Sequence, residues 1–150
     1  MKRFFLAIIL ITVLGCKKDD VPKSQTLNDD WTFKKVTDTS WYSANVPGQV
    51  HTDLLNNDLI KDPFVANNEL DLQWISEEDW MYKSEFLVDE ETMQRKHIEL
   101  HFNGLDTYAS VYLNDSLILK TNNAFREFMV DVKPIIKSKN VIKIVFEHTG

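Results

Sequence analysis

Hydrophobic and polar residues alternate along the stretch 96–120. Hydrophobic residues occupy every second position in two runs, first Ile98, Leu100 and Phe102, then Ala109, Val111 and Leu113. A period of two predicts half-buried strands with one face toward a core. Gly104–Asp106 interrupts the pattern and predicts a corner between the two strands. Asn114 and Asp115 tolerate the positive φ angles of a two-residue hairpin turn, so we expect the chain to reverse there and return over 117–119.

The same alternation recurs on both sides of this stretch. It predicts strands at about 31–36, 80–88, 128–132 and 142–146, with a turn at 138–140 before the last one. Short strands separated by turns favour two packed sheets over other layer arrangements. We therefore expect an all-β fold, a jelly-roll or galactose-binding-like β-sandwich.

The segments between these strands contain one predicted helix. Residues 49–59 carry Val50, Leu54 and Leu55 on one side, which indicates a short surface helix covering an end of the sandwich. The preceding residues 41–48 should be extended, because Pro47 disfavours a helical conformation at Val46. Two segments are expected to be loops, 65–78 with helical possibilities and 89–95 with room for one helical turn.

Composition and charge exclude several classes of function for this chain. The chain has 150 residues, of which 43% are hydrophobic, so one domain with a substantial core is expected. A formal net charge of −6 without a Lys/Arg stripe argues against nucleic acid as a partner. A single Cys rules out a disulfide framework and a metal site built from cysteines within the chain.

The N-terminus has the pattern of an export signal. Lys2 and Arg3 precede an apolar run, 4–13, which is shorter than the roughly 20 residues of a membrane span. The run ends in Val-Leu-Gly-Cys, which resembles a bacterial lipobox and implies lipid attachment at Cys16. We expect a signal peptide at 1–15, a tether at 16–26, and a lipoprotein anchored to the outer membrane on its periplasmic or cell-surface side. The alternative is an ordinary signal peptide with an incidental Cys.

The titratable residues form no recognisable catalytic or metal-binding pattern. The acidic residues in 69–79 lie in a predicted loop, where solvated carboxylates are the ordinary outcome. His97 and His101 would lie about 13 Å apart along a strand, too far to share one metal ion. His51 and His148 are remote in sequence. We therefore expect no metal, no cofactor and no catalytic residue in this chain.

The chain has four tryptophans, at positions 31, 41, 74 and 80. Packing in the core is the ordinary role for most of them. A Trp face can also stack on a sugar ring, because the ring C–H groups are apolar and the indole edge adds a donor. Trp74 lies in a predicted loop outside the strand alternation, so it is the candidate for an exposed substrate-binding residue.

Taken together, residues 27–147 resemble the N-terminal domain of family 2 glycoside hydrolases, and β-mannosidases in particular. The corner Gly104–Thr107 and the turn at Asn114 are motifs shared with the wider family. The series that points to β-mannosidases is Asp62-Pro63-Phe64, Gln73-Trp74-Ile75 and Asp79-Trp80. Further matching pieces are Val46-Pro47-Gly48, Asp53-Leu54-Leu55, Asn68-Glu69, and Asn123 with Phe125.

The resemblance implies a retaining exo-glycosidase that releases β-linked mannose from non-reducing ends. Its two catalytic glutamates would lie on a (β/α)₈ barrel, so this chain is expected to be the incomplete N-terminal sandwich domain, 27–150, without the last strands or the catalytic groups. The implied partners are β-mannosides and, through the lipid, a membrane. A stand-alone carbohydrate-binding or adhesion module on the cell surface is the alternative.

Overall fold

The computed structural model describes residues 21–63, 65 and 68–148, so Cys16 and the predicted signal peptide lie outside the described residues. Eight strands are present in this part: β1 Thr32–Lys35, β2 Tyr42–Ser43, β3 Trp80–Leu87, β4 Glu99–Phe102, β5 Tyr108–Leu113, β6 Ser116–Asn122, β7 Phe128–Asp131 and β8 Lys139–Phe146. The helical elements are α1 Val50–Asn56, α2 Glu90–Met93 and a 3₁₀ stretch, η1 Asn68–Glu77.

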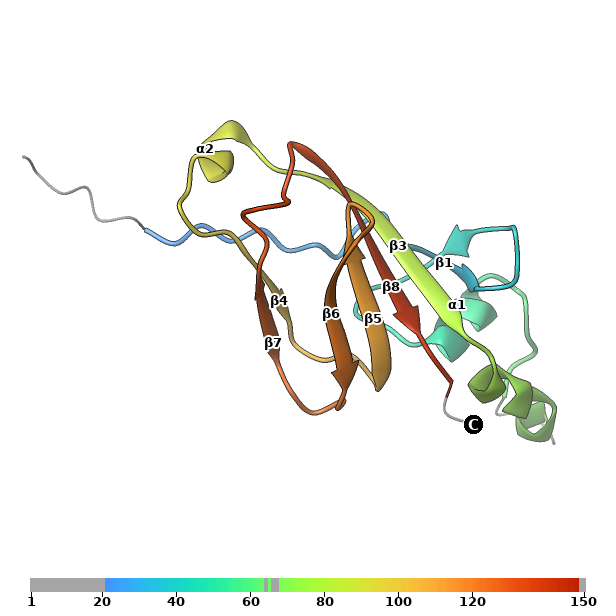
Figure 1. Ribbon diagram of the computed structural model, residues 1–150. Coiled ribbons are helices and arrows are strands. Elements are labelled where there is room, and N and C mark those ends of the chain that lie inside the picture. Colours follow the sequence, from blue (N-terminus) through green and yellow to red (C-terminus); the bar gives the residue numbers. More distant parts are fainter. Residues whose placement is uncertain (1–20, 64, 66–67, 149–150) are drawn as a thin grey trace, which may run out of the picture.

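The strands form two antiparallel sheets. The larger sheet has the order β2-β1-β3-β8-β5-β6, and the smaller sheet pairs β4 with β7. Figure 1 shows the β4–β7 pair beside β5 and β6, whereas α1 and η1 lie at the opposite, β1–β3 side. The all-β sandwich expected from the alternation is confirmed.

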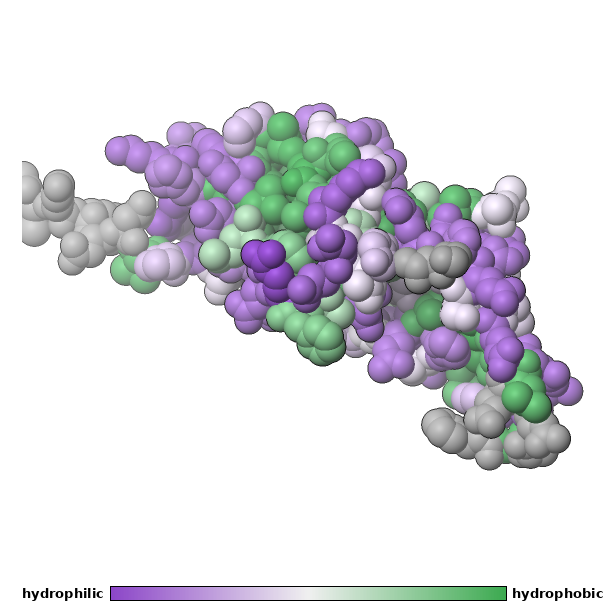
Figure 2. Space-filling model, turned by 60° about the horizontal axis from the view of Figure 1, so that its bottom comes forward, coloured by the Kyte–Doolittle hydropathy of each residue, from purple (hydrophilic) through white to green (hydrophobic). Residues whose placement is uncertain are grey.

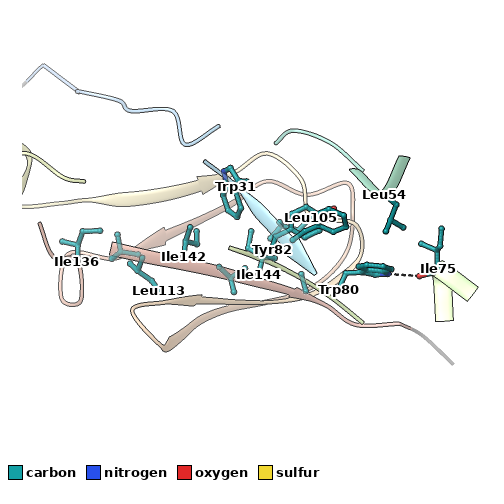
Figure 3. Close-up of a cluster of buried hydrophobic side chains, with 14 of the residues drawn as sticks. Trp31, Leu54, Ile75, Trp80, Tyr82, Leu105, Leu113, Ile136, Ile142 and Ile144 are labelled. Atoms are coloured by element: carbon teal, nitrogen blue, oxygen red, sulfur yellow. Dashed lines mark hydrogen bonds between the residues drawn. The ribbon is translucent and has the colours of Figure 1, made fainter. Parts of the chain in front are cut away.

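One face of the larger sheet holds the core. Phe33, Tyr82, Ile144 and Val111 stand opposite one another across β1, β3, β8 and β5, and all four are buried. Figure 3 shows Tyr82, Ile142 and Ile144 within one continuous hydrophobic cluster. Every second residue of β3 and β8 therefore faces the core, as the period of two predicts.

The corner and the hairpin of 96–120 have distinct roles. Residues 103–107 carry the chain from β4 in the smaller sheet to β5 in the larger one, and Leu105 at this corner is buried. Asn114 and Asp115 have φ angles of 49° and 68° and join β5 to β6 as a two-residue turn. The Asn114 amide also donates to the carbonyl of Ile135 and to the side chain of Asn140, so the hairpin is attached to the 132–140 connection.

The turn predicted at 138–140 is wrong in its position, because β8 already begins at Lys139. The backbone of Asn140 pairs with Phe86 in β3, so this residue belongs to the sheet. Its buried side chain supplies the hydrogen bonds of a turn instead, accepting from the backbone N–H of Lys137 and donating to the Lys137 carbonyl. A polar side chain can thus occupy a strand while it closes the preceding bend.

The short surface helix expected within 49–59 is confirmed as α1, and both segments with helical possibilities form helical turns. One turn of helix, α2, forms within 89–95, and the predicted loop 65–78 contains η1. In α1, Leu54 is buried as expected, but Val50 and Leu55 are only partly buried. The fully buried polar residue is Asp53, which the apolar pattern did not indicate.

The segment predicted to be a tether is described from residue 21 on, and it contacts the domain. Lys23 pairs with Asp89 at 2.5 Å, and the Arg95 guanidinium donates to the carbonyl of Val21 at 3.1 Å. Figure 1 shows the segment from residue 21 running extended past the sandwich toward β1. Across residues 21–63, 65 and 68–148, none of the helices has the length and apolar character needed to cross a membrane.

Candidate functional site

A groove lies between η1 and the β1–β2 side of the larger sheet. Its volume is about 190 Å³, and its lining residues are Phe33, Lys34, Lys35, Asp38, Tyr42, Leu54, Leu59, Trp74 and Trp80. A larger pocket of about 510 Å³ lies between residues 25–30 and the end of β3. Phe86 is the sole aromatic residue of that pocket, and its Lys139 is already paired with Glu85 at 2.7 Å. The smaller groove, with four aromatic residues, is the stronger candidate for binding a ligand.

Contacts with the core hold the aromatic residues of the groove in place. The buried Trp80 donates its indole N–H to the carbonyl of Ile75 at 2.9 Å, as Figure 3 shows. The Trp80 ring lies 5.9 Å from the ring of Phe33 and 6.1 Å from that of Trp74, measured between ring centres. Trp74 itself is 38% exposed. The sequence-based expectation that Trp74 is an exposed tryptophan is therefore confirmed, whereas Trp31 and Trp80 belong to the core.

Charged side chains form the rim of the groove. Lys35 pairs with Glu78 at 3.2 Å, and the Lys34 ammonium donates to the backbone carbonyls of Val36 and Asp38. Asp38 is among the lining residues as well. Two lysines and one aspartate therefore line the rim of an aromatic interior, and Glu78 outside the lining pairs with one of the lysines.

Asp53 supports the groove from the core side. It is fully buried, and its carboxylate accepts the backbone N–H of Asn45 at 2.9 Å and the hydroxyl of Tyr82 at 2.9 Å. Burial, and then the neighbouring carboxylate, raise the pKa of the Tyr82 hydroxyl, so it stays a donor. The bonds join α1, the 44–48 segment and β3. The sequence resemblance includes Asp53 in a motif of the family but does not predict its burial. An Asp beside two leucines in a surface helix is expected to face solvent.

Loops gather at a second place, the end of the sandwich at the bottom of Figure 1. There the β4–β5 corner lies beside the β6–β7 loop, and a Cβ on Gly104 would stand 3.4 Å from the Ala124 carbonyl oxygen. Phe125 in that loop is 99% exposed, and the Arg126 guanidinium lies 5.8 Å from the ring centre of Phe128. Figure 2 brings this end forward and shows hydrophobic surface interrupted by polar residues.

The acidic residues next to η1 pair with cations rather than with one another. Glu78 pairs with Lys35, and Asp79 accepts both the backbone N–H and the ring nitrogen of His148 at 2.8 Å. These two bonds from His148 lower the pKa of Asp79, and the same carboxylate raises the pKa of His148. Salt-bridged surface carboxylates fit the solvated role expected for this cluster.

The histidines remain scattered, as expected. His51, His97 and His101 are all exposed, and His101 contacts Glu99 of its own strand at 3.2 Å. Over the described parts of the chain, no three His, Cys, Asp or Glu side chains come together in a way that could hold a metal ion.

Comparison with known proteins places this architecture in a family. Residues 31–149 match the family described as glycosyl hydrolase 2 galactose-binding domain-like. The β-mannosidase of Capra hircus is 35% identical over 124 residues, covering 83% of this chain and 14% of the relative. β-Mannosidase B of Aspergillus terreus is 36% identical over 129 residues, covering 82% of this chain and 15% of the relative. The chain thus spans about one seventh of the length of these relatives.

Solved structures give the same result. The crystal structure of the β-D-mannosidase from Dictyoglomus thermophilum is similar with a TM-score of 0.77 and 41% identity, covering 80% of this chain and 15% of that one. An exo-chitosanase from Amycolatopsis orientalis has a TM-score of 0.72 at 16% identity over 85% of this chain and 17% of that one, which shows a shared fold. On this evidence the chain belongs to the galactose-binding domain-like family of glycosyl hydrolase 2 N-terminal domains.

Proposed function

We propose that this chain is the N-terminal sandwich domain of a β-mannosidase-like glycoside hydrolase that releases β-linked mannose from non-reducing ends with retention. The observation that carries the proposal is the likeness to the β-D-mannosidase from Dictyoglomus thermophilum, 41% identical over 80% of this chain. Curated β-mannosidases from animals and fungi match at 31–39% identity. Relatives of other specificity have much lower identity, such as the exo-chitosanase at 16%.

In this proposal the domain is a scaffold rather than the source of the catalytic groups. A retaining glycosidase needs two carboxyl groups about 5–5.5 Å apart. Glu78 and Asp79, the two acids that follow η1, are instead engaged by Lys35 and His148. The catalytic carboxylates would belong to a barrel elsewhere in the longer protein, and the sandwich would support that barrel.

A domain exchange tests the proposal. Residues 27–148 would replace the corresponding domain of the Dictyoglomus thermophilum β-D-mannosidase, and the chimera would be assayed with an aryl β-mannoside. We expect hydrolysis by the chimera and none by this chain alone. The unchanged enzyme is the positive control, and the same enzyme with the exo-chitosanase domain inserted controls for fold without specificity. A soluble, cooperatively melting chimera that hydrolyses no aryl β-mannoside, or hydrolysis by this chain alone, would refute the proposal.

Lipid anchoring is a second part of the proposal and rests on the sequence of residues 1–16. We infer that the protein is exported, that residues 1–15 are removed, and that Cys16 carries the lipid. Two acyl chains give firm membrane attachment, since each buried CH₂ contributes about 0.8 kcal/mol. Mass spectrometry of the N-terminal peptide should find acyl chains on Cys16, and C16S should move the protein from the membrane to the soluble fraction. An unmodified Cys16 peptide would contradict the inference.

A stand-alone carbohydrate-binding or adhesion module is the alternative function. The exposed face of Trp74 beside the groove favours it, because such modules bind sugars on aromatic surfaces. The domain exchange separates the two functions, since a binding module that is not part of a hydrolase has no reason to support catalysis in the chimera.

A further inference from the structure

We propose that the groove between η1 and the β1–β2 side of the sheet binds one neutral pyranose ring of a β-linked hexoside. The site would be an auxiliary sugar site within this domain. The choice of a neutral hexoside rests on the proposed function, whereas the place and the size of the ligand come from the groove itself.

Trp74 supplies the surface on which a sugar ring would stack. Of the two tryptophans at the groove, Trp80 is buried and serves as its floor, whereas Trp74 leaves 38% of its surface open to solvent. The sugar C–H groups pack on an indole face, and the indole N–H is available to a hydroxyl. Tyr42, which also lines the groove, adds a second aromatic surface with a hydroxyl.

The aromatic surface is organised before a ligand arrives. Two residues close to Trp74 along η1, Leu72 and Ile75, are buried in the core. The indole of Trp80 bonds the Ile75 carbonyl, and its ring contacts that of Trp74. A side chain that is already held in place loses little conformational freedom on binding, which favours affinity for a small ligand.

The polar rim offers both kinds of hydrogen-bond partner that hydroxyl groups require. The Asp38 carboxylate accepts hydrogen bonds, and the Lys35 ammonium donates them while it remains near Glu78. A sugar hydroxyl can donate to the one and accept from the other, so both partners suit a polyhydroxylated ring.

The size of the groove limits the ligand to a single ring. Pockets for drug-sized ligands measure about 300–1,000 Å³, so a groove of about 190 Å³ accommodates one pyranose with its neighbours in solvent. With so small a contact the affinity should be weak, and the site would act by retaining an oligosaccharide near the protein.

The test is a titration of the full chain with β-1,4-mannobiose, followed by tryptophan fluorescence and calorimetry. We expect saturable binding, and W74A should weaken it roughly tenfold, the loss of one aromatic contact. F125A is the control, because Phe125 is an exposed aromatic residue of the β6–β7 loop that does not line the groove. W74F should keep part of the affinity.

Each result of this titration decides the inference. Equal affinity of W74A and the unchanged chain would overturn it, as would no binding up to the solubility limit of mannobiose. Thermal melts of W74A and F125A confirm that both variants are folded before binding is compared. An active domain-exchange chimera together with absent mannobiose binding refutes the auxiliary site alone, and an inactive chimera with Trp74-dependent binding refutes the hydrolase assignment alone.

Discussion

The buried carboxylate of Asp53 gives the sharpest test of how this fold is held together. D53A would remove the acceptor of two hydrogen bonds, one from the Asn45 backbone N–H and one from the Tyr82 hydroxyl, both at 2.9 Å. Both bonds lie in the part of the domain where α1 packs on β3, and Asp53 has no solvent exposure. Water therefore cannot replace the lost acceptor without opening the packing.

The size of the effect follows from these two bonds. A hydrogen bond to a charged group contributes about 1.5–3 kcal/mol, and a buried donor left without a partner loses its desolvation energy. D53A should therefore lower the free energy of unfolding by about 3–5 kcal/mol, within the range for breaking a buried polar network. Y82F removes one bond and leaves Asp53 with the Asn45 N–H, so about 1.5–3 kcal/mol is expected.

Urea unfolding of the full chain, followed by tryptophan fluorescence, measures both values. Trp80 is a suitable reporter because it is buried next to Phe33 and Tyr82. D71A, at an exposed aspartate of η1, is the control and should change stability by less than about 0.5 kcal/mol. Values below about 1 kcal/mol for both D53A and Y82F would show that the network does not support the fold.

Two further predictions concern a close backbone approach and an ion pair. G48A should destabilise the domain by about 1–3 kcal/mol in the same urea assay, because the new Cβ would stand 2.2 Å from a backbone carbonyl oxygen; an unchanged midpoint would contradict this. The raised pKa of His148 means that its contribution to stability is present below the unfolded pKa of about 6.5 and is lost as pH rises through the folded pKa. The lowered pKa of Asp79 makes its own contribution present above about pH 3.9 and lost as pH falls through the folded value, so the pair stabilises most between these limits. An NMR titration should find the His148 pKa above that of an unfolded chain, and D79N should return it to the ordinary range; equal values in both proteins would rule out the pair.

The local alternation of hydrophobic and polar residues predicts most of the fold. The strand faces of β3 and β8 followed from alternation, because a strand buried on one side must place hydrophobic residues at every second position. The hairpin at Asn114 followed from the tolerance of Asn and Asp for positive φ, which 49° and 68° confirm. The position of Trp74 outside any strand period similarly indicated its exposure.

Other features required contacts between residues far apart in the chain. Asn140 lies in a strand because its backbone pairs with that of Phe86. Asn is a common turn residue, so the local sequence predicts a turn there instead. Asp53 is stable in the core because Tyr82, 29 residues away, donates to it. Neither partner is visible in the local sequence.

The sequence by itself thus determined which residues face the core, where the chain reverses, and the family resemblance that points to sugar chemistry. Only the tertiary structure decided what stands around Trp74. The groove combines residues of β1, β2, α1, η1 and β3, which are spread along the chain between positions 33 and 80. The physical reason is that strand alternation depends on neighbouring residues, whereas a groove depends on the packing of distant segments, which no local periodicity records.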